Sequence, residues 1–473
     1  MSRVAVLIAC ACSTAIASPR SDPTTGRAVF TGATMSSATS IDLNPAAIGP
    51  GTQTYLYIAA ATVIDHYGIR LDQQNLDGSI TQGSHLDDYE IGPGGNAAIV
   101  LHVNDRATLG AEFRSAPGET FIANRTDLAF HTLGGGQRTY TLGVAASLRI
   151  TNDIYFGVSL DAGPTYLHLH YARDSALENG HGARGVDSDC GQGTPCGIAN
   201  PQAEEHYDVN VGTRIFTTAN LVLNAGLLIQ VAHDVWFGIA FHAPPGLDVQ
   251  TDLQGTMDVR LAPRDGGALL HGGADVFISQ PSSADAELRA RLPASLDLHV
   301  GARWEDLSRL QAYDVRGYGA TLLTAGIPEW QLRVRGFHDP LAMWAGVEQV
   351  ELRRGSDWLR VGARIGFETS SVRNSETTPI TIAPFSYTAD VGAQLRVGAF
   401  ILQATYGVQY FPTVNVSDSA FDPRNRVSCI DSGYDYATPA CTATRNGYGI
   451  PSADGQYDRL EHAIRVGLTF QFE

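Results

Sequence analysis

Two histidines, His168 and His170, are the clearest candidates for metal chemistry in the sequence. In Leu-His-Leu-His the two rings share one face of an extended strand, and Asp174 follows shortly after. Nothing nearby supplies a third ligand, and the HExxH and GxSxG patterns of metalloproteases and serine hydrolases do not occur. The sequence therefore predicts no metal, no cofactor and no catalytic residue.

The charged residues exclude several further classes of site. The chain has 473 residues with 32 basic and 49 acidic side chains, a net charge of −17, and every basic residue is arginine. Without lysine there can be no P-loop lysine and no Schiff-base enzyme. An acidic chain without a basic stripe also repels phosphates, so we expect no nucleic-acid partner.

The first residues predict export. Residues 1–18 combine one early charge, a short apolar run and an Ala-Ile-Ala end, which is typical of a secretory signal peptide. Four cysteines follow in two close pairs within polar, Gly- and Pro-containing stretches. In an oxidising compartment these predict two local disulfides, Cys190–Cys196 and Cys429–Cys441.

The sequence pattern after residue 18 predicts strands. After residue 18 no run of 18 apolar residues occurs, but alternation of apolar and small or polar residues recurs in segments of about ten, as in 140–150, 221–231, 359–367 and 464–472. Such segments match tilted strands that cross a bilayer, with the apolar face toward lipid. The composition and pattern predict an all-β, transmembrane antiparallel β-barrel.

Glycine repeatedly occupies the other face of these strands. An apolar-Gly-apolar unit recurs eight times, for example around Gly143, Gly238 and Gly467. Glycine weakens a strand and is useful where another part of the molecule approaches the backbone. We therefore expect the lumen to be filled.

The links between strands alternate in length. Short links are expected at 104–105, 151–153, 232–234, 305–308, 355–357 and 397–398, with long polar stretches between them. Six short and seven long links predict about 14 strands, with both ends of the barrel sequence on the short-turn side. Segment 330–337 is a possible additional strand, and four tryptophans, including Trp344, are expected near the strand ends.

A family resemblance begins before the first strand. Residues 32–49 resemble the N-terminal hatch of FadL-type outer-membrane transporters of long-chain fatty acids and aromatic hydrocarbons, and Asn44-Pro45-Ala46 is similar to that family's Asn-Pro-Ala signature. Residues 109–118 resemble the family's third strand with its Ala-Pro-aromatic-Gly element, although the aromatic residue is missing from Ala116-Pro117-Gly118. Residues 292–301 and 359–362 also resemble recurring family elements.

The resemblance implies a signal peptide at 1–18, a hatch at 19–50 that plugs the lumen, and a barrel at 51–473. It further implies passive uptake of a hydrophobic ligand through the outer membrane, with sideways release when the hatch and the element at 116–118 act as a gate. The open alternative is that Pro117 only begins an outer loop. The partners would be the ligand, outer-membrane lipids and the barrel assembly machinery, and we expect a monomer.

Apolar residues on the inward face support a hydrophobic ligand. The lumen candidates for binding it are Val222, Leu228, Trp236, Ile401, Arg360 and Arg364. The inward arginines could meet a ligand carboxylate, or could form an internal ladder with acidic residues such as Asp297, Glu368 and Asp390 that holds the hatch. A general aqueous porin and a secreted soluble β-rich binding protein remain the alternative functions.

Overall fold

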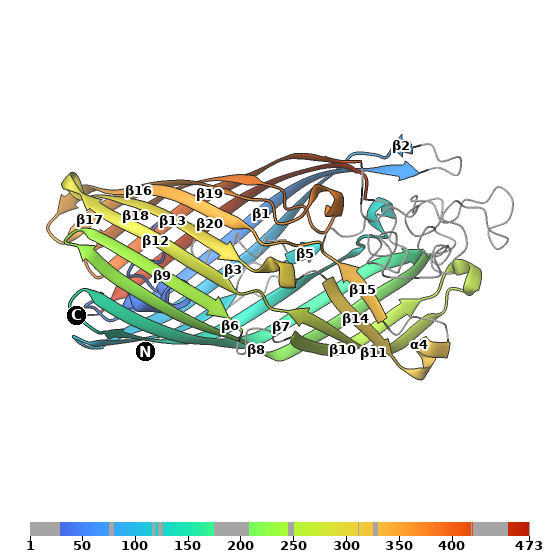
Figure 1. The fold of residues 1–473 in the computed structure, drawn as a ribbon, viewed down its shortest axis with the longest axis horizontal. Helices are drawn as coiled ribbons and strands as arrows, with labels where there is room; N and C mark the ends of the chain where they lie inside the picture. Colours follow the sequence, from blue (N-terminus) through green and yellow to red (C-terminus); the bar gives the residue numbers. More distant parts are fainter. Residues whose placement is uncertain are drawn as a thin grey trace, which may run out of the picture.

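The computed structural model describes residues 29–74, 80–115, 119–121, 126–174, 208–244, 250–310, 312–324, 330–417, 419 and 453–472. Figure 1 shows a long barrel of tilted antiparallel strands with short turns at one end and larger connections at the other. We call these the short-turn end and the outer end.

The barrel wall is a closed ring of 14 strands, as predicted. Closure is made by β20, which pairs with β1 from Tyr55↔Gln471 to Leu71↔Gly455, while β1 pairs on its other side with β3. In ring order the strands are β1 (Tyr55–Gln74), β3 (Leu86–Asn104), β4 (Ala107–Ser115), β6 (Gly134–Arg149), β7 (Ile154–Asp174), β8 (Asp208–Ala232), β9 (Val235–Ala243), β12 (Ser283–Leu292), β13 (Leu296–Glu305), β16 (Leu341–Arg354), β17 (Asp357–Glu368), β18 (Ser386–Val397), β19 (Phe400–Val416) and β20; β20 spans Gly455–Gln471.

The predicted two-faced alternation is confirmed. Large apolar side chains on the outer face are exposed around the wall, whereas the residues between them are smaller, polar or buried toward the lumen. Exposed examples are Leu142 and Val144 on β6, Val158 on β7, Ile365 on β17, Val391 on β18, and Val466 on β20. A face of this kind is stable against hydrocarbon, not against water.

The predicted short link at 305–308 is wrong. The turn that joins the neighbouring strands is Pro293–Ser295, where Ala294 and Ser295 adopt φ of 63° and 57°. These two non-glycine residues in the left-handed region reverse the chain at a place where the sequence gives no Gly or Asn signal. After Glu305 the chain instead enters the outer end. The ring strand expected directly after this link is replaced by β12, which precedes the turn, so the count of 14 holds.

A second group of strands extends the wall at the outer end. β10 (Gln250–Arg260) pairs with β8 and with β11 (Leu269–Ser279), and β14 (Ala312–Tyr318) joins β11 to β15 (Trp330–Val334). The possible strand at 330–337 is therefore present in its first half, outside the ring. Two three-residue strands, β2 (Ile80–Gln82) and β5 (Glu119–Phe121), pair with β1 and β6.

Helices are few and short. They are α1 (Ser40–Leu43), α4 (Ala320–Thr324) and the single-turn segments η1 (Pro45–Ile48), η2 (Thr126–Leu128), η4 (Pro263–Asp265), η5 (Pro293–Ser295), η6 (Leu307–Arg309) and η7 (Asn374–Glu376). Within the described ranges, no helix combines the length and the apolar character needed to span a bilayer.

The N-terminal segment, residues 29–50, lies inside the short-turn end of the barrel (Figure 1). Its apolar side chains are buried, with Ile41, Ala46 and Ile48 at 0% exposure. Ile41 and Ile48 pack against inward residues of β1, β3 and β6, and Ala46 packs against inward residues of β7 and β8. The expectation that the lumen is filled is met at this end.

Candidate functional site

Glycines of the wall form the seat of the N-terminal segment. Gly157, Gly226 and Gly238 lie on β7, β8 and β9, and a Cβ atom at each would collide with the segment. At Gly157 it would meet the backbone of Pro45 and Ala46, and at Gly226 the side chain of Asn44. The glycine repeat therefore permits a close approach of backbone to backbone.

Asn44 fixes the turn that enters this seat. Its Oδ1 accepts a hydrogen bond from the backbone N–H of Ala46 (3.1 Å), which caps η1, and Pro45 occupies the first position of that turn. Its Nδ2 donates to the carbonyl of Ala33 (2.6 Å) and to that of Leu227 on β8 (3.2 Å). The fully buried amide thus joins the segment to itself and to the wall.

Two buried glutamates on the opposite side hold the beginning of the segment. The backbone N–H of Phe30 donates to Oε1 of Glu348 (3.0 Å), and that of Thr34 donates to Oε1 of Glu287 (3.2 Å). His299 lies between the two carboxylates, 3.8 Å from Glu287 and 3.6 Å from Glu348. Because each glutamate is at most 4% exposed, the segment supplies donors that water cannot supply there.

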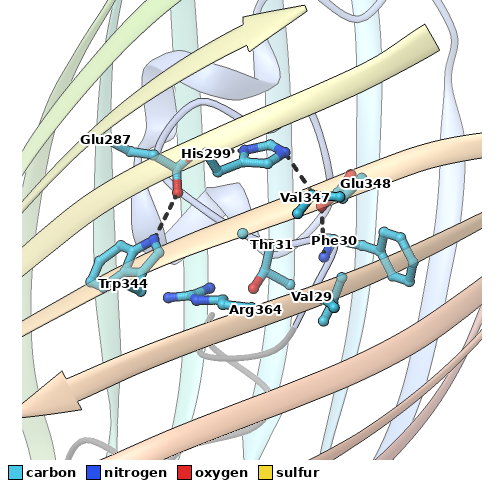
Figure 2. A pocket seen from close by; sticks show the side chains of 11 residues that line it. Val29, Phe30, Thr31, Glu287, His299, Trp344, Val347, Glu348 and Arg364 are labelled. Atoms are coloured by element: carbon cyan, nitrogen blue, oxygen red, sulfur yellow. Dashed lines mark hydrogen bonds and ion pairs between the residues drawn. The ribbon is translucent and has the colours of Figure 1, made fainter. Parts of the chain in front are cut away.

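A small pocket lies beside these contacts. Figure 2 shows Thr31 between Glu287, His299, Trp344 and Arg364, with the Phe30 ring pointing away from Trp344 and Arg364. The guanidinium of Arg364 stacks 4.3 Å from the ring centre of Trp344, whose Nε1 donates to Glu287 (3.4 Å). Its cavity volume is about 10 Å³, roughly the space of one water molecule, so the pocket in this form holds no larger ligand.

This pocket corrects the expectation for Trp344. The indole was expected near a strand end, in an interfacial girdle, but it lies inside the barrel against Arg364. Leu341 and Met343 on the same strand are exposed on the outer face, so the register of β16 puts Trp344 on the inward side.

The other predicted lumen residues face the inside of the barrel. Leu228 is fully buried with Ala46, Ala47 and Tyr155, and Trp236 packs against this group. Arg360 lies 3.5 Å from Oε2 of Glu348. Val222 and Ile401 are half-buried, and each lies between exposed outward neighbours in sequence. Leu228, Trp236 and Arg360 therefore contact the N-terminal segment or the residues that hold it.

One further ion pair anchors the segment to β4. Asp42 pairs with Arg114, and Ile41 packs over Gly110 on the same strand. Burial would raise the pKa of Asp42, but its ion pair with Arg114 holds that pKa below its ordinary value.

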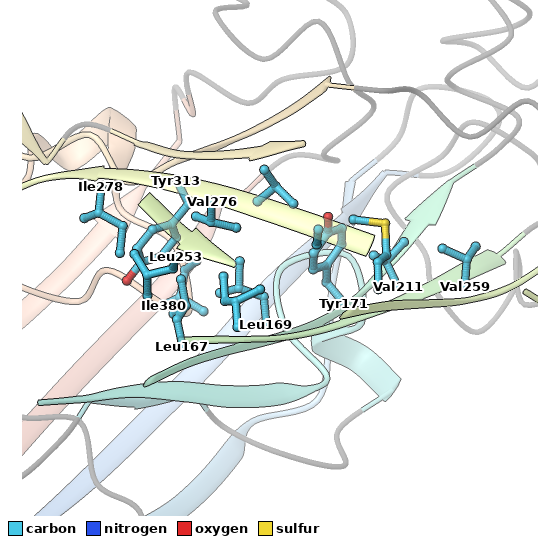
Figure 3. Close-up of a cluster of buried hydrophobic side chains, with 14 of the residues drawn as sticks. Leu167, Leu169, Tyr171, Val211, Leu253, Val259, Val276, Ile278, Tyr313 and Ile380 are labelled. Carbon is cyan, nitrogen blue, oxygen red and sulfur yellow. The ribbon is translucent and has the colours of Figure 1, made fainter. Parts of the chain in front are cut away.

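The outer end has an apolar interior. Figure 3 shows Leu167, Leu169 and Tyr171 of β7 packed with Leu253 of β10 and Val276 of β11. The remaining members come from β8, β10, β11, β14, α4 and the connections, and include Val211, Ile215, Met257, Ile278, Tyr313, Val315, Leu322 and Ile380. We call this group the outer apolar cluster.

A buried arginine, Arg335, borders the outer apolar cluster. Arg335 is 1% exposed and lies between the rings of Tyr313 (4.9 Å) and Phe337 (4.5 Å). Such stacking stabilises a desolvated guanidinium. Sequence reasoning missed this residue because it follows a short strand outside the ring, where no alternation marks its inward direction.

The predicted gate element, Ala116-Pro117-Gly118, lies outside the described residues. Below it, the β3–β4 ladder ends at Gly95↔Ser115, and the described residues of β3 beyond that point pair only with β1. There the guanidinium of Arg138 on β6 donates to the carbonyl of Pro93 on β3 (2.7 Å). The disulfide pairs Cys190–Cys196 and Cys429–Cys441 and the signal peptide also lie outside the described residues.

Comparison with solved structures identifies the architecture. A Pseudomonas aeruginosa FadL homologue matches with a TM-score of 0.74 at 14% identity, over 98% of this chain and 99% of that one. The CymD monoaromatic hydrocarbon channel and the Pseudomonas putida toluene transporter TodX each match at 0.58 and 12% identity, over 92% of this chain and 93% and 94% of theirs. The chain has the FadL-type barrel fold.

The resemblance seen in the sequence is thus confirmed at the level of the fold. No protein-family model matches the sequence, and the search of curated proteins gave no match. In this barrel the Asn44-Pro45-Ala46 turn contacts β7, β8 and β9, three strands that are neighbours in the ring.

His168 and His170, the two candidate metal ligands, lie apart from the N-terminal segment. The rings of His168 and His170 stack with centres 6.4 Å apart on β7, at the outer end. Sequence reasoning did not identify Glu287, Glu348 and His299 as partners of the segment. Their only sequence signal is charge on the inward face of a strand whose outward face is apolar.

Proposed function

We propose that this protein is an outer-membrane channel for the passive uptake of hydrophobic small molecules, such as long-chain fatty acids or hydrocarbons. The observation that carries the proposal is the contrast along the lumen. Apolar side chains fill the outer end, and the N-terminal segment fills the short-turn end. A hydrophobic solute gains about 25 cal/mol for each Å² that it removes from water, so an apolar outer end favours its capture.

The exposed surface supports placement in the outer membrane of a Gram-negative cell. Its outward apolar face runs around the ring, and a β-barrel with no free edge satisfies its backbone within lipid. The predicted signal peptide at 1–18 would direct the chain across the inner membrane. A soluble binding protein would instead have to expose this face to water.

We propose that the ligand leaves through the barrel wall. The N-terminal segment acts as the hatch, and ligand leaves sideways near residues 116–118 when the hatch moves. Support comes from the described residues on either side, where the described β3–β4 ladder ends at Gly95↔Ser115 and Arg138 of β6 donates to the carbonyl of Pro93 on β3. A proline within such a stretch cannot donate to a strand ladder.

The solved structures with this fold favour the same class of cargo. Those of TodX and CymD are described as a toluene transporter and a monoaromatic hydrocarbon channel. Because these proteins are transport channels, we also propose that the chain is not an enzyme. We expect it to act as a monomer after insertion by the barrel assembly machinery.

A general aqueous porin is the competing function, and conductance separates the two. Purified protein in a planar bilayer should give no steady ion current in the wild type, since the N-terminal segment closes the lumen. Mass spectrometry of the protein in mild detergent should then find co-purified lipid or hydrocarbon. A large, solute-size-dependent conductance together with no bound hydrophobic molecule would select the porin instead.

A further inference from the structure

Three carboxylates meet where the N-terminal segment contacts the wall. They belong to Asp42 on α1, Glu112 on β4 and Asp161 on β7, and one oxygen from each lies within 4.8 Å of the others. Glu112 and Asp161 are 4% and 2% exposed. Buried carboxylates at this separation repel one another unless a proton or a cation lies among them.

The cross-strand register explains how the two wall carboxylates come together. Glu112 pairs with Gly143 on β6, and Gly143 pairs with Asp161 on β7, so the three residues form one row across the sheet. Because Gly143 has no side chain, the carboxylates on either side extend over it. A Cβ at Gly143 would collide with Oδ1 of Asp161 and would lie 3.0 Å from Cγ of Glu112.

Amide side chains orient these carboxylates and occupy only one oxygen of each. Nδ2 of Asn96 donates to Oε2 of Glu112 (3.1 Å), and Nδ2 of Asn224 donates to Oδ2 of Asp161 (2.9 Å). The second oxygens, Oε1 of Glu112 and Oδ1 of Asp161, are buried and accept no hydrogen bond from the described residues. Both lie beside Gly143, on the side where the acidic cluster converges.

The neighbouring cation does not complete the site. Arg114 pairs with Asp42, and its Nη2 lies 4.0 Å from Oδ2 of Asp161, the oxygen that Asn224 already bonds, not the orphan Oδ1. The three carboxylates outnumber the guanidinium that pairs with them. Both ring nitrogens of His242 are engaged, one with Asn224 and one with Asp285.

We propose that Asp42, Glu112 and Asp161 form a binding site for one divalent cation of the Ca²⁺ type, which bridges the N-terminal segment to the barrel wall. A divalent cation would offset the excess of carboxylates, and the donors are all oxygens, as a hard cation requires. Ca²⁺ accepts irregular sets of carboxylate, carbonyl and water oxygens, which suits ligands supplied by three separate elements. The site is independent of what the channel transports.

Calcium titration of the full-length protein tests this site. Protein in detergent is stripped with EDTA, and binding of CaCl₂ is followed by isothermal titration calorimetry. We expect one Ca²⁺ per chain, and at least a tenfold weaker affinity in Glu112→Gln and in Asp161→Asn. Gly143→Ala should abolish binding without removing a charge, because its methyl group occupies the space between the orphan oxygens.

Asp285→Asn is the matched control. Asp285 is equally buried on the same inner layer, but its Oδ2 is bonded by His242 and Arg303. This variant should keep wild-type Ca²⁺ affinity. Heat-modifiable migration on a gel confirms folding of each variant, and the wild-type titration stands even where a variant fails to fold.

Three results would overturn the site. The first is the absence of Ca²⁺ binding by folded wild-type protein up to about 10 mM, above the range of weak extracellular calcium modules. The second is a protonated carboxylic-acid band in the infrared spectrum that is insensitive to Ca²⁺ and disappears in Glu112→Gln, because a proton then fills the role of the cation. The third is an equal loss of affinity in Asp285→Asn, which would show a general effect of inner-layer charge.

Discussion

The two ends of the barrel use the same strands for different purposes. On β7, the inward residues at the short-turn end are Tyr155, Ser159 and Asp161, whereas at the outer end they are Leu167 and Leu169. The short-turn end therefore holds the N-terminal segment through hydrogen bonds, ion pairs and glycine contacts. The outer end offers apolar packing, with buried charges such as Arg335 and the Arg459–Asp65 pair beside it.

Under the proposed function, this difference would let the channel admit hydrophobic solutes and exclude water. A hydrophobic solute entering from the outer end first meets surface that resembles its own, and then meets a polar layer that offers it no gain. Continuing straight through the barrel would require desolvated charges to lose their partners. Sideways exit into lipid would avoid that cost, which supports the lateral release proposed above.

Opening the short-turn end should have the largest effect. Gly226→Val places a branched side chain where the Asn44 amide lies, so the N-terminal segment must leave its seat. We expect the barrel to insert, the segment to become sensitive to protease, and planar-bilayer conductance to rise at least tenfold over the wild type. Gly212→Val is the control, because Gly212 lies on the same strand and a Cβ there would have no neighbour closer than 3.9 Å. If conductance is unchanged in Gly226→Val, the segment does not close the lumen.

Restoring the wall at the proposed exit should have the next largest effect. Pro117→Val combined with Gly118→Thr returns an amide donor and strand propensity to this stretch. Uptake of a radiolabelled long-chain fatty acid or hydrocarbon should fall several-fold at equal surface abundance, while conductance stays closed. Undiminished uptake would mean that the ligand leaves by another route.

A cavity in the outer apolar cluster should weaken only the outer end. Leu253 is fully buried there, so Leu253→Ala should cost about 2–5 kcal/mol of local stability. We expect faster proteolysis of the β10–β11 region, and unchanged protection of the N-terminal segment. Equally faster proteolysis at both ends would show that the two regions unfold as one cooperative unit and would contradict this prediction.

The last strand, β20, and Phe472 allow a test of barrel insertion that does not depend on the short-turn end or on the outer end. The apolar, outward side chains of β20 and the exposed Phe472 lie beside the first strand, where Phe472 N–H donates to the carbonyl of Thr54 (2.9 Å). Phe472→Ser should lower the amount of barrel inserted in the outer membrane by a few-fold. Unchanged heat-modifiable barrel on a gel would remove Phe472 from the assembly signal.

The disulfides should have the smallest effect. Peptide mapping without reduction should show Cys190 joined to Cys196 and Cys429 joined to Cys441. Because each closes a short loop, removing one should cost about 2–3 kcal/mol at most, with transport intact. Free thiols or cross-paired peptides would contradict this assignment.

The sequence predicted the wall better than the contents of the lumen. Alternation on β6, β17 and β20 identified the lipid-facing side, because lipid demands the same apolar character everywhere. The turn at Pro293–Ser295 was missed because Ala294 and Ser295 carry no sequence mark of their positive φ. Turn chemistry of that kind is set by the strands that it joins.

The partners of the N-terminal segment could not be predicted for a different reason. Phe30 and Glu348 are 318 positions apart, and only ring closure brings them together. The recurring glycines predicted that something approaches the wall, and Gly157, Gly226 and Gly238 meet the segment directly. The identity of each contact depends on register, which a one-residue shift would reverse.

The central claim is that the protein admits hydrophobic molecules and excludes hydrophilic ones. The most direct measurement compares uptake of a radiolabelled long-chain fatty acid or aromatic hydrocarbon with uptake of a small labelled sugar, in cells that contain or lack the protein. Our account predicts that the protein raises uptake of the hydrophobic compound several-fold and leaves sugar uptake unchanged. Faster sugar uptake with no change for the hydrophobic compound would contradict it.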